Sequence, residues 1–376
     1  MGAVISTVQS VTSTISAGLK TLASLHSEFS SLLTRAASAP GFPVPEPTQS
    51  YWLDDPPFPA LCDIQDDDLP QEADVVIIGS GIAGASVAKS LLELSESKLR
   101  VVVCEARQLC SGATGRNGGH IKSAPYEDVT QNSDASYTVK TSRGVIRTQH
   151  VVHTTNAYAG QLVPSLRGSL AGALAHMSAQ RPGASFPSSH GNRSWSVVYA
   201  PGFDYVTQRP DGPDGTPGDL MIGGGFFRSR REGLDQIGVW DDSQTHALPL
   251  MHIRGVMPTV FEPQWGEGSK LIKSWTGILG FTGDLMPLVG RVPGSRVQKD
   301  SGEWMAAGFC GEGMVWAWLC GTALAVMVLG KEGEDLAEGV GRPGGKLNEW
   351  FPKHLLTVDK KRLRKAEIAN LADFFE

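Results

Sequence analysis

The chain has 376 residues, of which 41% are hydrophobic and 19% charged, and this globular composition excludes a wholly disordered protein. Its formal net charge of −6 argues against a protein that binds nucleic-acid phosphates. The five cysteines include no CxxC pair, which argues against a zinc cluster or a disulfide framework and favours a reducing compartment such as the cytoplasm. We therefore expect no bound metal and no nucleic-acid partner.

An apolar stripe in residues 1–40 predicts an amphipathic N-terminal helix, because its members recur every three or four positions. We expect this helix to pack on its own domain or on a partner. An interfacial membrane helix is the alternative, although its polar face lacks the usual lysines and arginines. The start, Met1 to Ser6, fits the N-myristoylation pattern, so a peripheral membrane location stays open. The stripe consists of Val4, Val8, Val11, Ile15, Leu19, Leu22, Leu25, Phe29 and Leu32.

A connector rich in proline and aspartate, residues 41–70, precedes a βαβ pattern within residues 71–165. Residues 73–78 form a continuous apolar run, which suits a parallel strand buried on both faces. A helix over 82–94 and a second buried strand over 99–104 follow. Strand, glycine turn, helix and strand together make one βαβ unit.

Residues 166–300 are strand-like runs broken by turn clusters, and they predict an antiparallel lobe. A hairpin over 137–146 and a strand over 151–155 come before this lobe. Residues 301–332 then return to the first domain with a short strand, a glycine turn and an uncharged helix. We expect that helix to be buried and not to span a membrane, since it contains Gly321 and follows a glycine turn.

The tail, residues 333–376, is amphipathic and ends in a charged helix. Its basic patch at residues 360–365 is expected to face solvent.

The run Gly79-Ser80-Gly81-Ile82-Ala83-Gly84 fits the GxGxxG pattern in the required context, after a buried strand and before a helix. Gly79 permits the tight turn, Gly81 lets the backbone approach a pyrophosphate, and Gly84 lets helix and strand pack closely. The helix N-terminus offers N–H groups and the positive end of its dipole to phosphates. Glu105 ends the second strand, where its carboxylate suits a ribose diol and would repel the 2′-phosphate of NADP. A glycine turn that binds nothing is the alternative.

The residues after the second strand favour FAD over NAD. Residues 106–120 form a small, polar, glycine-rich run that can lie along an extended cofactor and donate backbone N–H groups to it. NAD-only folds usually continue with ordinary βαβ units. A plain surface loop is the alternative interpretation of this run.

Several segments resemble the D-amino-acid-oxidase-like (DAO) superfamily. The run ADVVIIGSGIAGASVAKSLLE, followed by VVVCEA and CSGATGRNGGH, looks like its amino-terminal FAD motif. Three later segments also resemble parts of this family. The strand that returns to the FAD domain is similar to VVHTTNAYAGQLVP, and the substrate-domain signature is similar to SWTGILGFTGDLMPLVG. The final flavin-side turn and helix are similar to AAGFCGEGMVWAWLCG. The resemblance covers most of residues 50 to 330. It is nearest to the branch of gamma-glutamylputrescine, sarcosine and glycine oxidases, and the leader SYWLDDPPFP is similar to fungal members.

The resemblance implies an α/β fold, with a Rossmann-like FAD-binding domain of the glutathione-reductase type and a reduced antiparallel substrate domain. It implies non-covalent FAD, an amine or amino acid as substrate, and oxygen as electron acceptor with hydrogen peroxide as a product. The final turn would point its helix N-terminus at the pyrimidine end of the flavin. The implied cofactor-binding residues are Gly79, Gly81, Ile82, Ala83, Gly84, Glu105, Ala106, Arg107, Ser111, Gly112, Ala113, Thr114, Asn117, Gly118, Gly119, Asn156, Ala157, Gly308, Gly311, Glu312, Gly313 and Met314.

The chain departs from the family between the GRNGGH motif and the returning strand. Only about 30 residues separate His120 from Val151, where members carry a long stretch that helps to bind adenosine and builds part of the substrate lobe. The join falls near Tyr126, Glu127 and Asp128. We therefore expect an internally shortened member that lacks roughly half of that lobe and exposes apolar surface where the flavin would lie.

Three residues are candidates for catalysis. His120 ends the glycine run and could accept or place the proton of the amine, because oxidation needs the amine neutral. A histidine that merely hydrogen-bonds the flavin or the backbone is the alternative. Arg116 could neutralise a phosphate or anchor a carboxylate, with a structural salt bridge as the equal alternative. Trp275 could pack beside the flavin ring.

Two rival functions stand beside an FAD-dependent oxidoreductase that acts on a C–N bond. One is a non-catalytic or weakly active remnant, left by loss of part of the lobe. The other is a membrane-associated flavoprotein dehydrogenase that passes electrons to a carrier other than oxygen.

Overall fold

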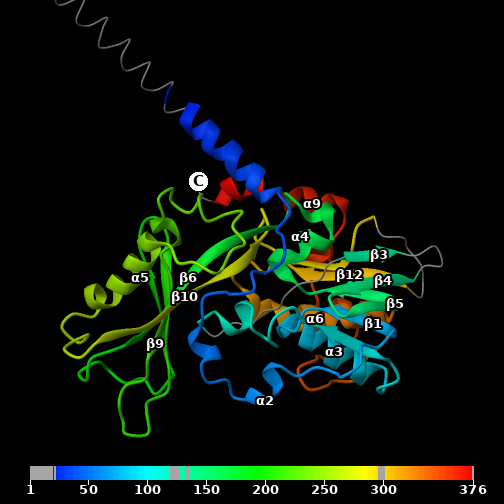
Figure 1. Cartoon of the computed structure of the whole chain (residues 1–376), viewed down its shortest axis with the longest axis horizontal. Helices are drawn as coiled ribbons and strands as arrows, with labels where there is room; N and C mark the ends of the chain where they lie inside the picture. Colours follow the sequence, from blue (N-terminus) through cyan, green and yellow to red (C-terminus); the bar gives the residue numbers. More distant parts are fainter. Residues whose placement is uncertain (1–19, 21–22, 119–127, 132–135, 295–300, 375–376) are drawn as a thin grey trace, which may run out of the picture.

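The computed structural model describes residues 20, 23–118, 128–131, 136–294 and 301–374, which form two lobes (Figure 1). One lobe is built around a mostly parallel sheet and the other around an antiparallel sheet. The long strands β6 (Ala171–Arg181) and β10 (Lys270–Phe281) run from the antiparallel lobe toward the parallel one. The predicted α/β fold class is confirmed.

The parallel lobe is centred on β1 (Glu72–Ile78), which pairs in parallel with β2 (Val101–Cys104) and β5 (Gly144–His153). Strand β12 (Gly302–Ala307) extends the parallel sheet beyond β5, and β11 (Leu288–Arg291) adds an antiparallel edge. The last four residues of β1 are all buried, which explains why this strand is a continuous apolar run.

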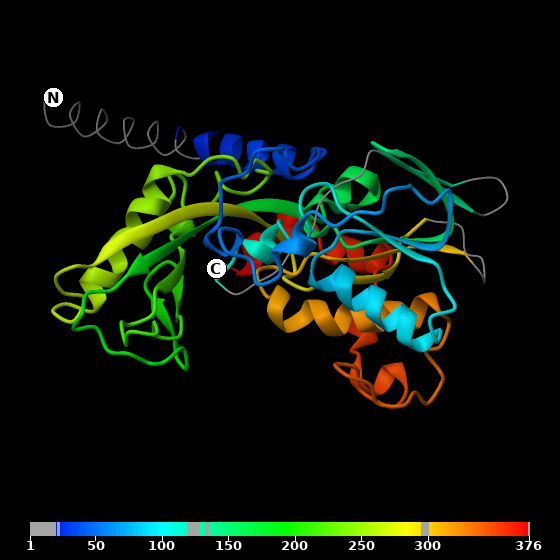
Figure 2. The same ribbon diagram turned by 60° about the horizontal axis from the view of Figure 1, so that its bottom comes forward.

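Helices cover one face of this sheet, and hairpin side chains cover the other. On the first face α3 (Ile82–Leu94) packs beside α6 (Gly313–Val328), drawn in cyan and orange in Figure 2. On the second face lies the core supplied by the hairpin of β4 (Tyr137–Thr141) and β5, while β3 (Asp128–Gln131) pairs with β4. Alternate side chains of β1 therefore enter two separate cores.

The antiparallel lobe has the strand order β10-β6-β9-β8-β7, completed by β9 (Leu220–Gly224), β8 (Phe203–Gln208) and β7 (Ser194–Val198). Helix α5 (Ala247–Val260) covers one face of this sheet. The opposite face is also apolar, and this second face points toward the parallel lobe. Its buried side chains are Met177, Ala179, Met221 and Trp275, with Tyr205 packed against them.

Short helical turns connect or end these elements. They are η1 (Tyr51–Leu53), α2 (Pro59–Cys62), η2 (Ala113–Gly115), η3 (Asn156–Tyr158), α4 (Ala159–Leu162), η4 (Pro164–Leu166), η5 (Phe226–Arg228), α7 (Leu347–Trp350), α8 (Lys353–Leu356), α9 (Lys360–Lys365) and η6 (Ile368–Phe374).

The βαβ unit is confirmed, and its helix has the predicted bounds. The prediction of a buried second strand over 99–104 is wrong: β2 spans Val101–Cys104, none of its residues is buried, and Val103 is 42% exposed. The reason is that β2 lies at the edge of the sheet, where among the described strands it pairs with β1 alone.

The hairpin over 137–146 is confirmed as well. The strand expected at 151–155 is instead the second half of β5, because residues 147–153 continue without a break along β1. One strand thus serves both the hairpin and the parallel sheet.

The connector docks on the molecule instead of standing free. Residues 48–54, here called the strap, contact both the parallel lobe and β10. For example, the hydroxyl of Thr48 accepts a hydrogen bond from the backbone N–H of Thr276 at 2.9 Å.

The two ends of the described chain meet on the surface of the antiparallel lobe. Residues 23–36 are helical, and Leu32 and Ala36 are buried in one cluster with Ile368 and Leu371. Leu25, on the predicted apolar stripe, is 55% exposed. Among the described residues, none of the helices combines the length and the apolarity needed to cross a membrane.

The basic patch of the tail is not wholly solvated, so the prediction is wrong for Arg362. Its guanidinium is buried, lies 2.7 Å from Asp284, and donates to the carbonyl oxygen of Met286 at 2.8 Å. The helix α9 packs against the loop after β10, and this packing buries the side chain of Arg362.

Replacing Gly84 with alanine is expected to lower the free energy of unfolding by at least about 2 kcal/mol. A Cβ there would lie 2.0 Å from the carbonyl oxygen of Gly79, so α3 would have to move off the turn. The matched control is Gly255→Ala in α5, where a Cβ meets nothing within 4 Å and alanine should stabilise by about 0.5–1 kcal/mol. Urea unfolding checks both, and a Gly84→Ala curve equal to wild type would contradict the close packing.

His176 should make stability fall in mild acid. Burial, together with the neighbouring His246, lowers the pKa of His176 to about 4. In the unfolded chain this side chain titrates at about pH 6.5. The unfolded state therefore takes up a proton first as the pH falls, so the stability that the neutral His176 contributes is complete above that pH and is lost as the pH falls toward 4. Urea unfolding at pH 7 and pH 5 should show a loss of about 2 kcal/mol in wild type and a smaller loss in His176→Gln. Equal losses in the two proteins would refute this assignment.

Candidate functional site

The predicted phosphate turn lies at the carboxyl edge of the parallel sheet. Gly79 follows β1 with a φ of 115°, a left-handed conformation that favours glycine, and Gly81 directly precedes α3. Ala83 is buried in the helix-side core and Ile82 packs against it, so these two residues offer the turn their backbone. The first N–H groups of α3 lack intrahelical partners, and the turn is therefore suited to an anion.

Glu105 follows β2, and its carboxylate lies beside this turn. One oxygen accepts hydrogen bonds from the backbone N–H of Ser80 at 3.1 Å and from the Ser80 hydroxyl. The other accepts from the N–H groups of Ala106 at 3.0 Å and Arg107 at 3.2 Å. Burial raises the pKa of Glu105, and these hydrogen bonds oppose the shift. The carboxylate is thereby held at the position predicted for ribose contact.

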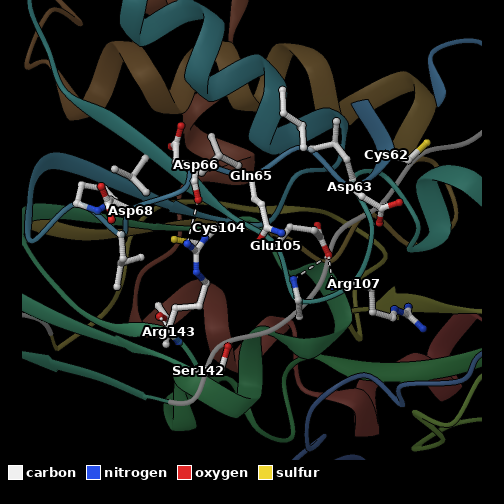
Figure 3. A pocket seen from close by; sticks show the side chains of 18 of the residues that line it. Cys62, Asp63, Gln65, Asp66, Asp68, Cys104, Glu105, Arg107, Ser142 and Arg143 are labelled. Atoms are coloured by element: carbon white, nitrogen blue, oxygen red, sulfur yellow. Dashed lines mark hydrogen bonds between the residues drawn. The ribbon is translucent and has the colours of Figure 1, made fainter. Parts of the chain in front are cut away.

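A groove of about 720 Å³ opens next to Glu105 and runs along β2 (Figure 3). Side chains of β2, the connector and the β4–β5 turn line it. From that turn, Arg143 donates to the carbonyl oxygens of Asp66 and Asp67, each at 2.9 Å. The volume lies in the range of small-molecule sites, so the groove can hold the nucleoside part of a cofactor.

Three buried hydroxyls test whether FAD fits. Ser111 and Thr114 lie in the glycine loop, residues 111–118, and Thr155 follows β5. None of the three has a hydrogen-bond partner among the described residues. A buried hydroxyl without a partner costs about 1–3 kcal/mol, so a polar ligand that reached these groups would gain hydrogen bonds from them. An extended cofactor with phosphates and hydroxyls is a ligand of that kind.

Asn156 holds the second glycine turn in place. Its side-chain oxygen accepts from the backbone N–H of Gly308 at 2.8 Å and of Phe309 at 3.3 Å. Gly280 of β10 lies so close that a Cβ there would be 2.5 Å from the same oxygen. Asn156 thus joins both lobes to the turn that opens α6, while its neighbour Ala157 is buried.

The start of α6 is open to solvent. Gly311 and Glu312 are exposed, and Gly313 begins the helix. Met314 is 44% exposed and Val315 is 65% exposed. This apolar surface lies at the turn where the resemblance would place the flavin, and the uncovering of the flavin side by a shortened lobe stays a prediction.

The glycine loop is held by the strap. The hydroxyl of Ser50 donates to the carbonyl oxygen of Gly115, and the indole of Trp52 donates to that of Asn117 at 2.5 Å. The loop is therefore ordered by residues that precede the βαβ unit in the chain. The other predicted residues of this loop are Gly112, Ala113 and Gly118.

Arg116 is 2% exposed and forms an ion pair with Asp242, with 3.4 Å between its Nε and the carboxylate. Burial lowers the pKa of Arg116 to about 10, and Asp242 opposes this shift. Trp275 is fully buried and donates its indole N–H to the carbonyl oxygen of Arg116. The structure thus shows Arg116 in the predicted salt bridge. Its other suggested roles, neutralising a phosphate or anchoring a substrate carboxylate, stay predictions. Its Nη2 has no partner among the described residues.

Gly119 and His120 lie outside the described residues, so the proton-accepting role of His120 stays a prediction. Sequence reasoning missed Ser80, Thr155 and Asp242. Ser80 and Thr155 each adjoin a predicted residue, so closer attention to hydroxyls beside the motifs would have found them. Asp242 lies 135 residues from its partner Arg107, and no local pattern marks it.

Comparisons with known proteins identify a family by its model and similar proteins by shorter or weaker matches. The DAO family model, described as FAD dependent oxidoreductase, matches residues 74–134 and 124–327. Among curated proteins, one chain of the anaerobic glycerol-3-phosphate dehydrogenase of Escherichia coli (strain K12) is 34% identical over 87 residues, which is 23% of the present chain. That match spans 16% of the length of the curated protein.

Solved structures show the same fold at low identity. Glycine oxidase from Geobacillus kaustophilus has a TM-score of 0.51 and 15% identity, covering 70% of this chain and 96% of that one. L-Amino acid deaminase from Proteus myxofaciens has a TM-score of 0.51 and 13% identity, covering 77% and 95%. L-Proline dehydrogenase from P. horikoshii has a TM-score of 0.50 and 17% identity, covering 69% and 94%.

The two matched segments of the family model together span well over half of the chain, and the phosphate turn, Glu105 and the partnerless hydroxyls fit the cofactor of that family. The chain therefore belongs to the DAO family of FAD-dependent oxidoreductases, and FAD is its cofactor.

Proposed function

We propose that the chain oxidises a C–N bond of an amine or amino acid and passes the electrons to oxygen, giving hydrogen peroxide. The observation that carries this proposal is the contact of the glycine loop with the apolar face of the antiparallel sheet. A Cβ on Gly118 would lie 3.3 Å from Met177 and 3.5 Å from Tyr205. This contact places the apolar side chains of Met177 and Tyr205 directly beside the loop that is expected to hold FAD, so a substrate bound next to that loop would lie in apolar surroundings. The names of the three similar solved structures, which concern amino acids, support this substrate class.

FAD, when bound, accepts a hydride from the carbon next to the amine nitrogen. The chain supplies N–H groups at the first turns of α3 and α6, which stabilise negative charge on the cofactor. Met177, Tyr205 and Trp275 keep the loop side of the sheet apolar, and this favours the neutral form of a bound amine. His120, two residues after Gly118, is the proposed acceptor of the amine proton.

We also propose that FAD is bound without a covalent link. Cys310 lies in the second glycine turn, but its thiol donates to the carbonyl oxygen of Gly308 at 3.1 Å. Burial raises the pKa of Cys310, and it raises the pKa of Cys110, in the first loop, to about 11. Both thiols are thus kept protonated, and a protonated thiol is a poor nucleophile.

The cellular setting and the branch are also part of the proposal. None of the five cysteines, all of which are among the described residues, forms a disulfide bond, which favours the cytoplasm over an oxidising compartment. The motifs described above favour the branch of gamma-glutamylputrescine, sarcosine and glycine oxidases, with a fungal leader.

A shortened, weakly active remnant is the second candidate. The family match breaks where its two segments overlap, at residues 124–134, and this range contains the join inferred from the sequence. Among the described strands, β2 pairs with β1 alone, so its outer edge has no strand beside it. The exposed apolar start of α6 also favours this candidate.

The first test is the visible absorbance of the purified chain. We expect a flavin band that moves to the supernatant on acid precipitation, because FAD is held without a covalent bond. Gly81→Val should remove the band, since a side chain there blocks the approach of the pyrophosphate. Gly333→Ala, where a Cβ meets nothing within 4 Å, should keep it. A wild-type protein that stays colourless with added FAD would favour the remnant.

The second test is peroxide release from a panel of primary amines, secondary amines and amino acids. A substrate should bleach the flavin without oxygen and yield peroxide once oxygen is admitted. If a substrate bleaches the flavin but no peroxide is released, the electrons pass to an acceptor other than oxygen. If the protein holds FAD but no compound of the panel bleaches the flavin, the non-catalytic remnant would replace the oxidase as the proposed function.

A further inference from the structure

A single buried carboxylate joins the antiparallel lobe to the cofactor loop. Asp242 lies between β9 and α5 and is 1% exposed. It pairs with Arg107 at 3.3 Å and with Arg116 at 3.4 Å. All three side chains are at most 10% exposed, so water screens these charges little.

The two arginines flank opposite ends of the segment that binds FAD. The backbone N–H of Arg107 donates to Glu105, the carboxylate at the ribose position. Arg116 lies within the glycine loop, and its Nε also donates to the carbonyl oxygen of Ser111 at 3.1 Å. The side chain of Asp242 is therefore in direct contact with both ends of the loop between Glu105 and Asn117.

The backbone of Asp242 also connects the antiparallel lobe to the strap. Its carbonyl oxygen accepts from the backbone N–H of Thr48 at 2.8 Å and from the hydroxyl of Thr276 at 3.1 Å. Arg116 in turn donates to the carbonyl oxygens of Thr48 at 2.6 Å and of Thr276 at 2.9 Å. The strap and β10 thus meet the glycine loop at this one residue, the first two through its carbonyl oxygen and the loop through its carboxylate.

We infer that Asp242 is a positioning residue for FAD, which acts through Arg107 and Arg116 to hold Glu105 and the glycine loop in the shape that receives the cofactor. Without the carboxylate, two buried guanidinium groups face each other without a counter-charge, and the loop must open to hydrate them. Cofactor affinity thus depends on a residue of the antiparallel lobe. This inference depends on FAD binding and not on the substrate proposed above.

The test measures the dissociation constant of FAD from apoprotein by quenching of flavin fluorescence. Asp242→Asn should weaken FAD binding by at least about tenfold, and Asp242→Glu should restore part of the loss. Asp204→Asn is the matched control, because Asp204 is equally buried in the same lobe but holds His252 and Tyr199, away from the loop. The control should change FAD affinity by less than about twofold.

A double-mutant cycle separates positioning from general destabilisation. Because part of the effect of Asp242 runs through Arg116, the double variant Arg116→Gln, Asp242→Asn should lose less FAD affinity than the sum of the two single losses, and the remaining loss is the part that runs through Arg107. Additive losses, an unchanged Asp242→Asn, or an equal loss in Asp204→Asn would each overturn the inference. If Asp242→Asn does not fold, Arg107→Lys keeps the charge but loses the forked contact. FAD affinity equal to wild type in that variant would overturn the inference too.

Discussion

Burial of the polar backbone of residues 111–118 between two lobes is the constraint on which the rest of the structure depends. A buried carbonyl or N–H left unpaired costs about 1–3 kcal/mol, so the loop must find partners wherever it is enclosed. Ser50 and Trp52 of the strap donate to two of its carbonyl oxygens, and Thr207 of the antiparallel sheet donates to a third. Neither lobe satisfies the loop alone, and this shared requirement fixes how the lobes meet.

Hydrogen-bond partners also distinguish polar groups that serve the fold from polar groups that we propose for the cofactor. Arg116 uses most of its donors on the protein, whereas the hydroxyls of Ser111, Thr114 and Thr155 have no partner among the described residues. These three hydroxyls are therefore the groups that we propose to contact FAD.

Much of the cofactor site could be predicted, because it depends on short-range geometry. Gly79, Gly84 and Glu105 are related by the length of one strand, one turn and one helix, and the pattern of residues 73–105 specifies all three. The role of Asn156 toward the cofactor stays a prediction, and its contact with the turn at Gly308 could not be foreseen, since the turn lies 152 residues away. The connector that contains the strap was interpreted as extended because of its prolines, and an extended conformation does not indicate what the chain contacts.

The sequence by itself determined the cofactor class, the order of the lobes and the position of the phosphate turn. These features follow from apolar periodicity and from glycines at fixed local spacing, which act within one βαβ unit. The tertiary structure alone decided which charges meet: Asp242 with Arg107 and Arg116, and Arg362 with Asp284. Pairing of buried charges depends on which surfaces face each other after folding, and no local spacing carries that information.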